Sequence, residues 1–251
     1  MTSVAQLSDP HLRAGHDDRG AARALEIAVA AVLDLRPHPD AVLVSGDVGE
    51  HGDPAEYAMA RELLAPLPMP VHVLAGNHDD PEVLSEAFGT PARYTVEVGE
   101  LALVACDTPL PGRLEGELDL DWLEAQLEAT RGRPVVIAMH HPPLLTGIPV
   151  LDEIGLPAHQ RVALAELFAR FPDVRRVVAG HVHRTAFALL GGRGVVTAPS
   201  TNLQARLEIG GQAFEFRPEP PGFLLHVELG GELVTHVQTL PRDEPPTRGG
   251  D

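Results

Sequence analysis

The sequence predicts an α/β fold in which two packed β-sheets carry helices on their outer faces. Over the first part of the 251-residue chain, short apolar runs alternate with amphipathic stretches, as strands alternate with helices. The later part holds paired apolar runs around Gly191-Gly192 and Gly230-Gly231, which is typical of β-hairpins. The length allows one large core or two small ones, and the alternation of strands and helices favours one domain, which we expect over residues 1–240. Residues 241–251 are rich in proline, glycine and charge and are expected to form a disordered tail.

The individual elements follow from apolar periodicity and from boundary signals. Helices are predicted where apolar residues recur at helical spacing and proline marks an end, at 21–35, 54–67, 81–88, 121–130 and 158–171. Strands are predicted for short apolar runs at 3–7, 41–45, 71–75, 94–98, 101–105, 135–139, 174–179, 185–190, 194–197, 223–229 and 232–240. Two segments, 142–157 and 203–221, lack a clear period; we expect an irregular lid or binding loop in the first and an exposed hairpin near Gly210-Gly211 in the second.

Charge and cysteine content exclude several classes of partner. The formal net charge of −17 argues against a nucleic-acid polymer or an anionic membrane bound through a basic surface. It is compatible with a phosphate substrate, because bound cations would reverse the local field. Cys106 is the only cysteine, so no intrachain disulfide forms and a small buried residue is expected. No apolar run approaches the ~20 residues that span a bilayer, and no leader segment is seen, so we predict a cytoplasmic protein.

Polar side chains follow five of the predicted strands, at the point where each strand ends. One such turn would be an ordinary exposed loop, but five turns that all carry His, Asp or Asn indicate a shared site. Ligands bind outside the carboxyl ends of parallel strands. Imidazole with carboxylate and amide donors suits Fe, Mn, Zn or Co. The candidates are Asp9, His11, Asp47, Asn77, His78, Asp79, His140, His141, His181 and His183.

The last pair of candidates sets a condition on the backbone. His181 and His183 are alternate residues, and alternate residues of an extended strand point to opposite sides. They reach one site only from a turned backbone, or they approach two ions from different directions. We expect Gly180 to supply the turn.

These motifs resemble those of the calcineurin-like metallophosphoesterases, and they are most similar to bacterial class III cyclic-nucleotide phosphodiesterases and glycerophosphodiesterases. The five motifs stand in the family's order and none is missing. The resemblance implies a four-layer αββα sandwich of two mixed sheets flanked by helices, with the metallophosphoesterase domain over 1–240. The motifs are Asp9-Pro10-His11, Gly46-Asp47, Gly76-Asn77-His78-Asp79, His140-His141-Pro142 and Gly180-His181-Val182-His183.

The resemblance also implies a dinuclear centre of two divalent or trivalent transition-metal ions. Asp9, His11 and His183 would hold the first ion. Asn77, His140 and His181 would hold the second, and Asp47 would bridge the two. A water activated by the metals would attack phosphorus in line with the leaving oxygen. We assign His78 to the leaving alkoxide or the transition state, Asp79 to orienting His78, and Asn77, His78 and His141 to substrate contact.

Three functions fit this site. The first is a phosphodiesterase acting on small diesters such as 3′,5′-cyclic nucleotides or glycerophosphodiesters. The second is a phosphomonoesterase that acts on nucleotides or phosphoproteins, and the third is a non-catalytic metal-binding scaffold, which should have lost ligands. The segments 142–157 and 203–221 contain only Arg206 and Arg217 as cations, which favours a monoanionic diester. Arg13, His16 and Arg184 lie near motifs but are more simply solvated, and the sequence leaves open whether the chain forms a homo-oligomer.

Overall fold

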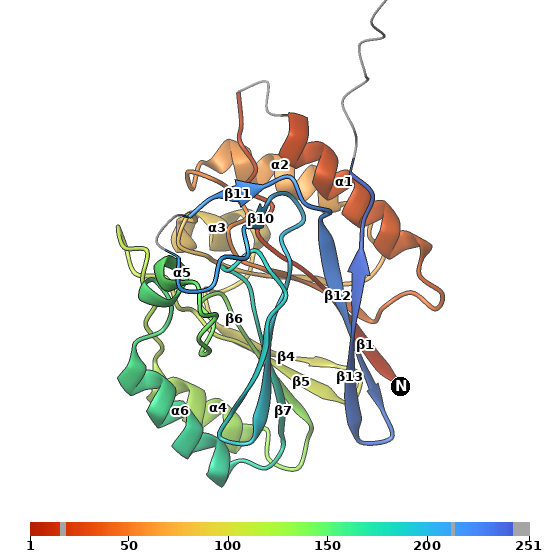
Figure 1. Ribbon diagram of the computed structural model, residues 1–251. Helices are drawn as coiled ribbons and strands as arrows, with labels where there is room; N and C mark the ends of the chain where they lie inside the picture. Colours follow the sequence, from red (N-terminus) through yellow and green to blue (C-terminus); the bar gives the residue numbers. More distant parts are fainter. Residues whose placement is uncertain (16–18, 212–213, 243–251) are drawn as a thin grey trace, which may run out of the picture.

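The computed structural model describes residues 1–15, 19–211 and 214–242. Two mixed β-sheets pack face to face, with helices on both outer faces (Figure 1). The strand order is β13-β12-β1-β2-β3 in the first sheet and β4-β5-β6-β7-β9-β8 in the second. The prediction of a four-layer αββα sandwich is confirmed.

The first sheet is built around three parallel strands. These are β1 (Thr2–Leu7), β2 (Ala41–Ser45) and β3 (Val71–Leu74), while β12 (Gly222–Leu229) and β13 (Glu232–Thr239) pair antiparallel at the side of β1. Its outer face is covered by α1 (Arg19–Asp34), α2 (Pro54–Leu64) and α3 (Pro81–Phe88). The predicted Asp-Pro starts are N-caps: Asp53 accepts from Ala55 N, and Asp80 accepts from Glu82 N and Val83 N.

The second sheet contains four parallel strands with an antiparallel strand at each edge. The parallel strands are β5 (Leu101–Ala105), β6 (Val135–Met139), β7 (Val174–Ala179) and β9 (Arg193–Thr197). The edges are β4 (Tyr94–Val98) and β8 (Phe187–Leu190). The helices α4 (Leu120–Ala129) and α6 (Ala158–Arg170) cover the outer face of this sheet (Figure 1).

The interface between the sheets is mainly apolar, and it includes a buried amide, that of Gln6, which is hydrogen-bonded. Side chains such as Leu43 and Leu103, from opposite sheets, belong to one buried cluster, and burying each such leucine contributes about 1.5–3 kcal/mol. Gln6 Nε2 donates to Ser45 Oγ at 2.8 Å and across the interface to Ala179 O at 3.0 Å. A satisfied buried amide of this kind fixes how the sheets are registered. It joins the ends of β1, β2 and β7, three of the strands that carry candidate ligands.

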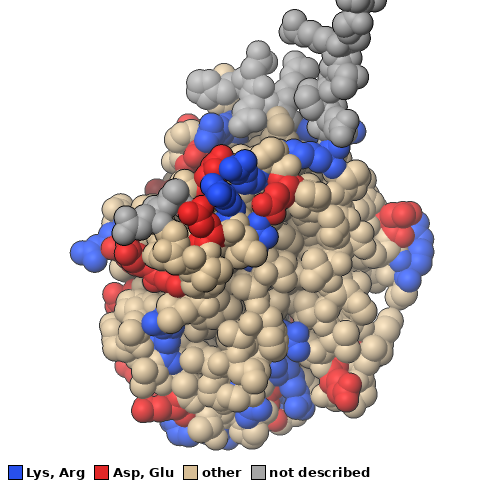
Figure 2. Space-filling view, viewed as in Figure 1, with Lys and Arg blue, Asp and Glu red and all other residues tan. Residues whose placement is uncertain are grey.

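The two segments without a clear period are more ordered than expected. Residues 149–153 of the first form a short helix, α5 (Pro149–Glu153). In the second, β10 (Gln204–Ala205) pairs with β11 (Phe216–Arg217), so the segment is a hairpin as predicted, with residues 212–213 of its tip outside the described residues. Figure 2 shows basic and acidic side chains next to one another over this hairpin.

Several predictions concern residues at the limits of the structure. His16 and residues 243–251 of the predicted tail lie outside the described residues, so those predictions stay untested. Cys106 is buried, as expected. Across the described ranges, no helix is both long and apolar enough to cross a lipid bilayer.

Candidate metal centre

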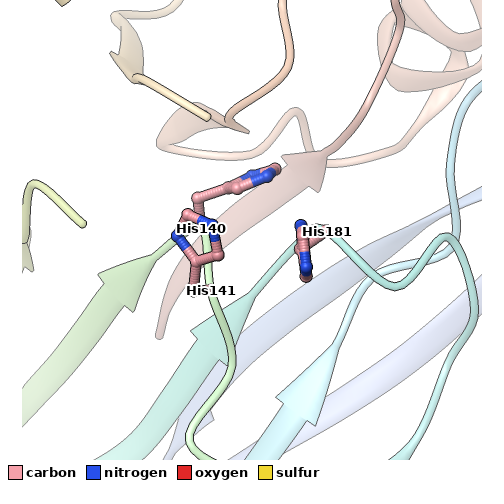
Figure 3. A group of neighbouring side chains, drawn as sticks. All are labelled: His140, His141 and His181. Atoms are coloured by element: carbon pink, nitrogen blue, oxygen red, sulfur yellow. The ribbon is translucent and has the colours of Figure 1, made fainter. Parts of the chain in front are cut away.

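All seven predicted ligands lie just after the carboxyl ends of strands, and the structure brings them together. The ends of β1, β2 and β3 supply Asp9, His11, Asp47 and Asn77, whereas β6 and β7 of the other sheet supply His140, His181 and His183. Figure 3 shows His140 and His181 after neighbouring strands, and their ring centroids are 5.1 Å apart. The site therefore forms where the strand ends of the two packed sheets meet.

Four of the ligands form a first group. One donor atom from each of Asp9, His11, Asp47 and His183 lies within 4.8 Å of the others. The Nε2 atoms of His11 and His183 are 2.9 Å apart. His11 Nε2 is 3.4 Å from Asp47 Oδ2, and His183 Nε2 is 3.6 Å from Asp9 Oδ1. The group contains two buried carboxylates facing two imidazole nitrogens.

The second group gathers around the amide oxygen of Asn77. This oxygen is 3.1 Å from His140 Nε2 and 2.9 Å from His181 Nδ1. His140 Nε2 is also 3.4 Å from Asp47 Oδ2. The same Asp47 oxygen is thus 3.4 Å from one imidazole of each group. Asp47 stands between two sets of donors.

Hydrogen bonds to the far side of three imidazoles fix which nitrogen carries the proton. The Nδ1 atoms of His11, His140 and His183 lie 2.7, 2.9 and 2.8 Å from Glu50 Oε2, Ser45 O and Leu203 O. A carboxylate or carbonyl oxygen only accepts, so each Nδ1 donates, and in the neutral ring Nε2 then carries the lone pair that a metal ion needs. His181 Nε2 is buried with no hydrogen-bond partner. Buried lone pairs facing carboxylates are costly unless a cation joins them, so these residues fit metal ions.

The charges of the site act differently on different imidazoles: burial opposes protonation of His140, but the Asp47 carboxylate raises its pKa to about 9, whereas two other rings stay neutral. Burial lowers the pKa of His183 to about 4 and holds the pKa of His181 well below its usual range. Both rings are therefore neutral near pH 7, as metal ligation requires. Burial opposes ionisation of Asp47, yet the neighbouring imidazoles of His140 and His11 hold its pKa well below its ordinary value. The buried carboxylate is charged and requires nearby positive charge.

Backbone strain is concentrated at these ligands. Among the described residues, five that are not glycine have a left-handed φ: Asp9 (51°), His11 (51°), Asp47 (48°), His181 (71°) and His183 (46°). Each such residue costs about 1–3 kcal/mol and persists only where the surrounding structure over-determines it. One restraint is His181 N, which donates to Asp9 Oδ1 at 3.0 Å. Strain that falls on five candidate ligands indicates a functional constraint.

The prediction that Gly180 supplies the turn before His183 is wrong. Its φ is not left-handed, and His181 and His183 make the turn themselves. A Cβ at Gly180 would lie 2.3 Å from Ser8 Oγ and 2.6 Å from Ser45 O. Glycine is needed there because the ends of β1 and β2 approach the end of β7 closely.

His78 lies at the rim of the site, and Asp79 does not orient it. The Nδ1 of His78 donates to Glu50 O at 3.1 Å, so its Nε2 is the nitrogen left for a ligand. Asp79 instead accepts from the backbone N–H groups of Gly76, Val48 and Gly49 at 2.8–3.1 Å. Its carboxylate ties the loop after β2 to the loop after β3. The predicted contact with His78 is corrected to this loop-fixing arrangement.

His141 also differs from its predicted role as a substrate contact. Its side chain is buried beside His140, as Figure 3 shows, and it has 0% exposure. Nδ1 bonds Thr108 Oγ1 at 2.9 Å and Nε2 lies 2.9 Å from Leu114 O. Both nitrogens are therefore occupied within the protein, and the geometry does not support substrate contact. The His141 ring centroid is 4.6 Å from that of His181, so the side chain lies beside the ligand rings with both of its nitrogens already bonded.

Glu50 was missed by the sequence interpretation. Its Oε2 accepts from His11 Nδ1, and its Oε1 accepts from Arg13 Nη2 at 2.9 Å. Burial disfavours the ionised form, but the hydrogen bond and charge of His11, with smaller contributions from His78 and Arg13, together lower the pKa of Glu50 to about 2. Its carbonyl also accepts from His78, so one residue orients two site imidazoles. The only sequence signal was its place three residues after Asp47, where a glutamate between glycines resembles a solvated charge.

Two open clefts meet at His78. A cleft of about 170 Å³ is lined by His11, Arg13, Glu50, His78, His183, Asn202, Leu203 and Phe216. A wider cleft of about 870 Å³ lies on the other side of His78, lined in part by Asp80, Glu82 and Asp107. The smaller cleft reaches the predicted ligands His11 and His183, whereas none of the seven lines the wider one. A substrate held at His78 has room on either side.

Comparison with known proteins agrees with this geometry. The model of the family "Calcineurin-like phosphoesterase" matches residues 2–185. The chain is 32% identical to the glycerophosphodiester phosphodiesterase GpdQ of Enterobacter lignolyticus, over 94% of this chain and 91% of that protein. It is 33% identical to the 3′,5′-cyclic adenosine monophosphate phosphodiesterase CpdA of Pseudomonas aeruginosa, over 94% and 89%.

Among solved structures, the fold is similar to purple acid phosphatase PPD1 from yellow lupin. The TM-score is 0.64 at 15% identity, over 95% of this chain and 51% of that one. GAP50, the anchor in the inner membrane complex of Plasmodium, has a TM-score of 0.65 at 14% identity, over 98% and 90%. These two likenesses concern the fold alone, whereas the family match covers all five motifs. The chain therefore belongs to the calcineurin-like phosphoesterase family of metal-dependent hydrolases.

Proposed function

We propose that the chain is a dinuclear-metal phosphodiesterase that hydrolyses small diesters such as 3′,5′-cyclic nucleotides or glycerophosphodiesters. The observation that carries this proposal is the position of Asp47 Oδ2, 3.4 Å from His11 Nε2 and 3.4 Å from His140 Nε2. One carboxylate between two donor groups is the arrangement that two neighbouring cations require. The similarity to GpdQ and CpdA supports small diesters as the substrate class.

The residue roles follow from the two groups. Asp9, His11 and His183 would hold one ion, Asn77, His140 and His181 would hold the other, and Asp47 would be shared by the two. Two such ions lower the pKa of a water molecule and neutralise charge on the phosphoryl oxygens. Fe, Mn, Zn and Co all suit this mixed set of nitrogen and oxygen donors.

His78 acts on the substrate from the rim. Its Nδ1–H is held by Glu50 O, which directs the other ring nitrogen away from the Glu50 carbonyl. From Nε2 the imidazolium donates its proton to the leaving alkoxide, which otherwise departs as a strong base. His78 lines both clefts, so the two substituents of a diester fit on opposite sides of it.

The surrounding cations favour a diester over a monoester dianion. Arg206 and Arg217 pair with Glu215, and Arg206 also pairs with Glu208. Arg13 pairs with Glu50, and Arg184 pairs with Glu219 at 2.6 Å. Each of these arginines is already paired with a carboxylate, so it would contribute little to binding the second negative charge of a monoester. A phosphomonoesterase is therefore the second candidate.

The test is hydrolysis of a cyclic nucleotide, glycerophosphoethanolamine and a phosphomonoester by one preparation with matched metal content. We expect kcat/KM to be at least about tenfold higher for a diester than for the monoester. A higher value for the monoester would support the second candidate. Two bound metals per chain with no hydrolysis of any phosphoester would support a non-catalytic scaffold. The cytoplasmic location, the homo-oligomer and the single domain over 1–240 stay predictions.

A further inference from the structure

We propose that Phe216 is a specificity-determining residue that selects diesters carrying a planar ring, such as a nucleobase. This inference rests on the proposed function and assigns the 170 Å³ cleft to one substituent of the substrate. Pockets that bury a whole drug-sized ligand occupy roughly 300–1,000 Å³. The cleft is smaller, so it accommodates part of a substrate whose phosphate lies at the ligand groups.

The aromatic surface of the cleft is exposed and close to the ligands. Phe216 lines the cleft with 42% of its surface exposed, and its ring centroid is 4.7 Å from that of His183. Phe214, 36% exposed, lies against Phe216 with centroids 4.9 Å apart and the rings nearly perpendicular. Only 4% of the chain is aromatic. Two partly exposed phenylalanines beside a metal ligand are thus an uncommon use of these residues.

The hydrogen bonds of the hairpin fix Phe216 relative to the candidate metal site. Phe216 pairs with Ala205 across β10 and β11, and Ala205 N donates to His183 O at 3.2 Å. Leu203, which also lines the cleft, accepts from His183 Nδ1 through its carbonyl. The same hydrogen bonds therefore hold both His183 and Phe216 in place. A preformed position lowers the ordering cost of substrate binding.

The chemistry of the cleft suits a heteroaromatic ring better than a glycerol. Stacking of a base on an aromatic side chain is worth roughly 5- to 150-fold in binding. Arg13 lines the same cleft, and a guanidinium adds attraction to an aromatic face. A glycerol substituent has no flat apolar face, so it gains little from Phe216. The prediction is a preference between substrates, with the hydrolytic groups unchanged.

The variants Phe216→Leu and Phe216→Trp test this role. Leucine keeps an apolar cover over His183 but removes the flat face, whereas tryptophan keeps one. We expect Phe216→Leu to lower kcat/KM for 3′,5′-cyclic AMP about tenfold, mainly through KM, and to leave glycerophosphoethanolamine within about twofold. Phe216→Trp should restore the preference. Phe187→Leu, at an exposed phenylalanine on β8 outside the cleft, is the matched control.

A binding measurement separates this inference from the proposed function. Adenosine 5′-phosphate and ribose 5-phosphate differ only in the base, and calorimetry gives their affinities without turnover. We expect the wild type to prefer the adenosine compound and Phe216→Leu to lose about tenfold of that preference. An equal loss of affinity for both ligands in Phe216→Leu, or no loss of affinity for either, would overturn the role of Phe216. Absence of diester hydrolysis with the base preference intact would overturn the proposed function alone.

Discussion

The Nε2 atoms of His11 and His183 lie 2.9 Å apart, although 172 positions separate the two residues in the chain. Each ring donates from Nδ1, His11 to Glu50 and His183 to the Leu203 carbonyl. When both rings are neutral, two lone pairs therefore face each other in a buried site, where a shared cation would relieve their repulsion. Both residues have left-handed backbone, so the fold maintains this contact against local preference.

Replacing the residue between the two donor groups tests the dinuclear arrangement. We expect Asp47→Ala to lose both metals and nearly all hydrolysis, because its carboxylate lies near an imidazole of each group. Removing a residue that only orients a ligand lowers metal affinity by about 10- to 100-fold, and removing a ligand shared by two ions should lower it more. Elemental analysis and initial rates measure both effects, with the exposed Asp34→Ala as control. Two metals per chain in Asp47→Ala would rule out the bridging role.

Replacing the rim histidine tests the proton donor. We expect His78→Ala to keep both metals, because His78 is in neither donor group around Asp47. Turnover of diesters with poor leaving groups should fall by roughly 10²–10⁴, the range of general acid–base groups. A p-nitrophenyl diester, whose leaving group needs no proton, should be affected much less. An unchanged rate with a poor leaving group would remove His78 from the mechanism.

Glu50 provides a test of how His11 is oriented. We expect Glu50→Ala to weaken metal binding by about 10- to 100-fold, because His11 loses the acceptor that fixes its tautomer. Glu50→Gln keeps an acceptor oxygen and should lose less. Metal-binding titrations give the two affinities. Arg13→Ala removes the ion pair with Glu50 but keeps the Glu50 carboxylate, so it shows how much of the effect comes from that ion pair. If Glu50→Ala binds metal as tightly as the wild type, His11 is held in place by other contacts.

A buried histidine away from the metal centre predicts a pH dependence of stability. His226 contacts Gln6 and Thr235, and burial, with a smaller effect of Arg176, lowers its pKa from 6.5 to about 3. Between these values the unfolded chain binds a proton that the folded chain does not. The free energy of unfolding should therefore fall as the pH falls below 6.5, by about 1.4 kcal/mol per pH unit for this group.

Urea unfolding of the wild type and His226→Gln between pH 7 and pH 5 measures this contribution. In the variant, the free energy of unfolding should change less steeply with pH, because about one proton fewer is taken up on unfolding. This difference in slope is expected whatever the stability of the variant at pH 7. His38→Gln, at an exposed position, serves as the control for removing a histidine. Identical slopes for His226→Gln and the wild type would show that His226 is not the group responsible.

The errors of the sequence interpretation share one physical cause. Asp79 was expected to orient His78, but its oxygens accept from three backbone N–H groups. His141 was expected to meet the substrate, but Thr108 and Leu114 occupy its nitrogens. Apart from Gly76, these partners come from loops distant in sequence. A hydrogen-bonding side chain binds whatever the packed chain brings near, and adjacency to a ligand does not specify that partner.

The sequence by itself determined the layered α/β architecture and the seven residues that converge. Strands and helices have periodic apolar patterns in the sequence. Residues that follow the carboxyl ends of parallel strands lie together at one edge of the sheet. The tertiary structure alone decided that Glu50 orients His11 and that Phe216 lies beside His183. These relationships depend on how two sheets and a distant hairpin pack, and contacts between segments far apart in the chain leave no local pattern.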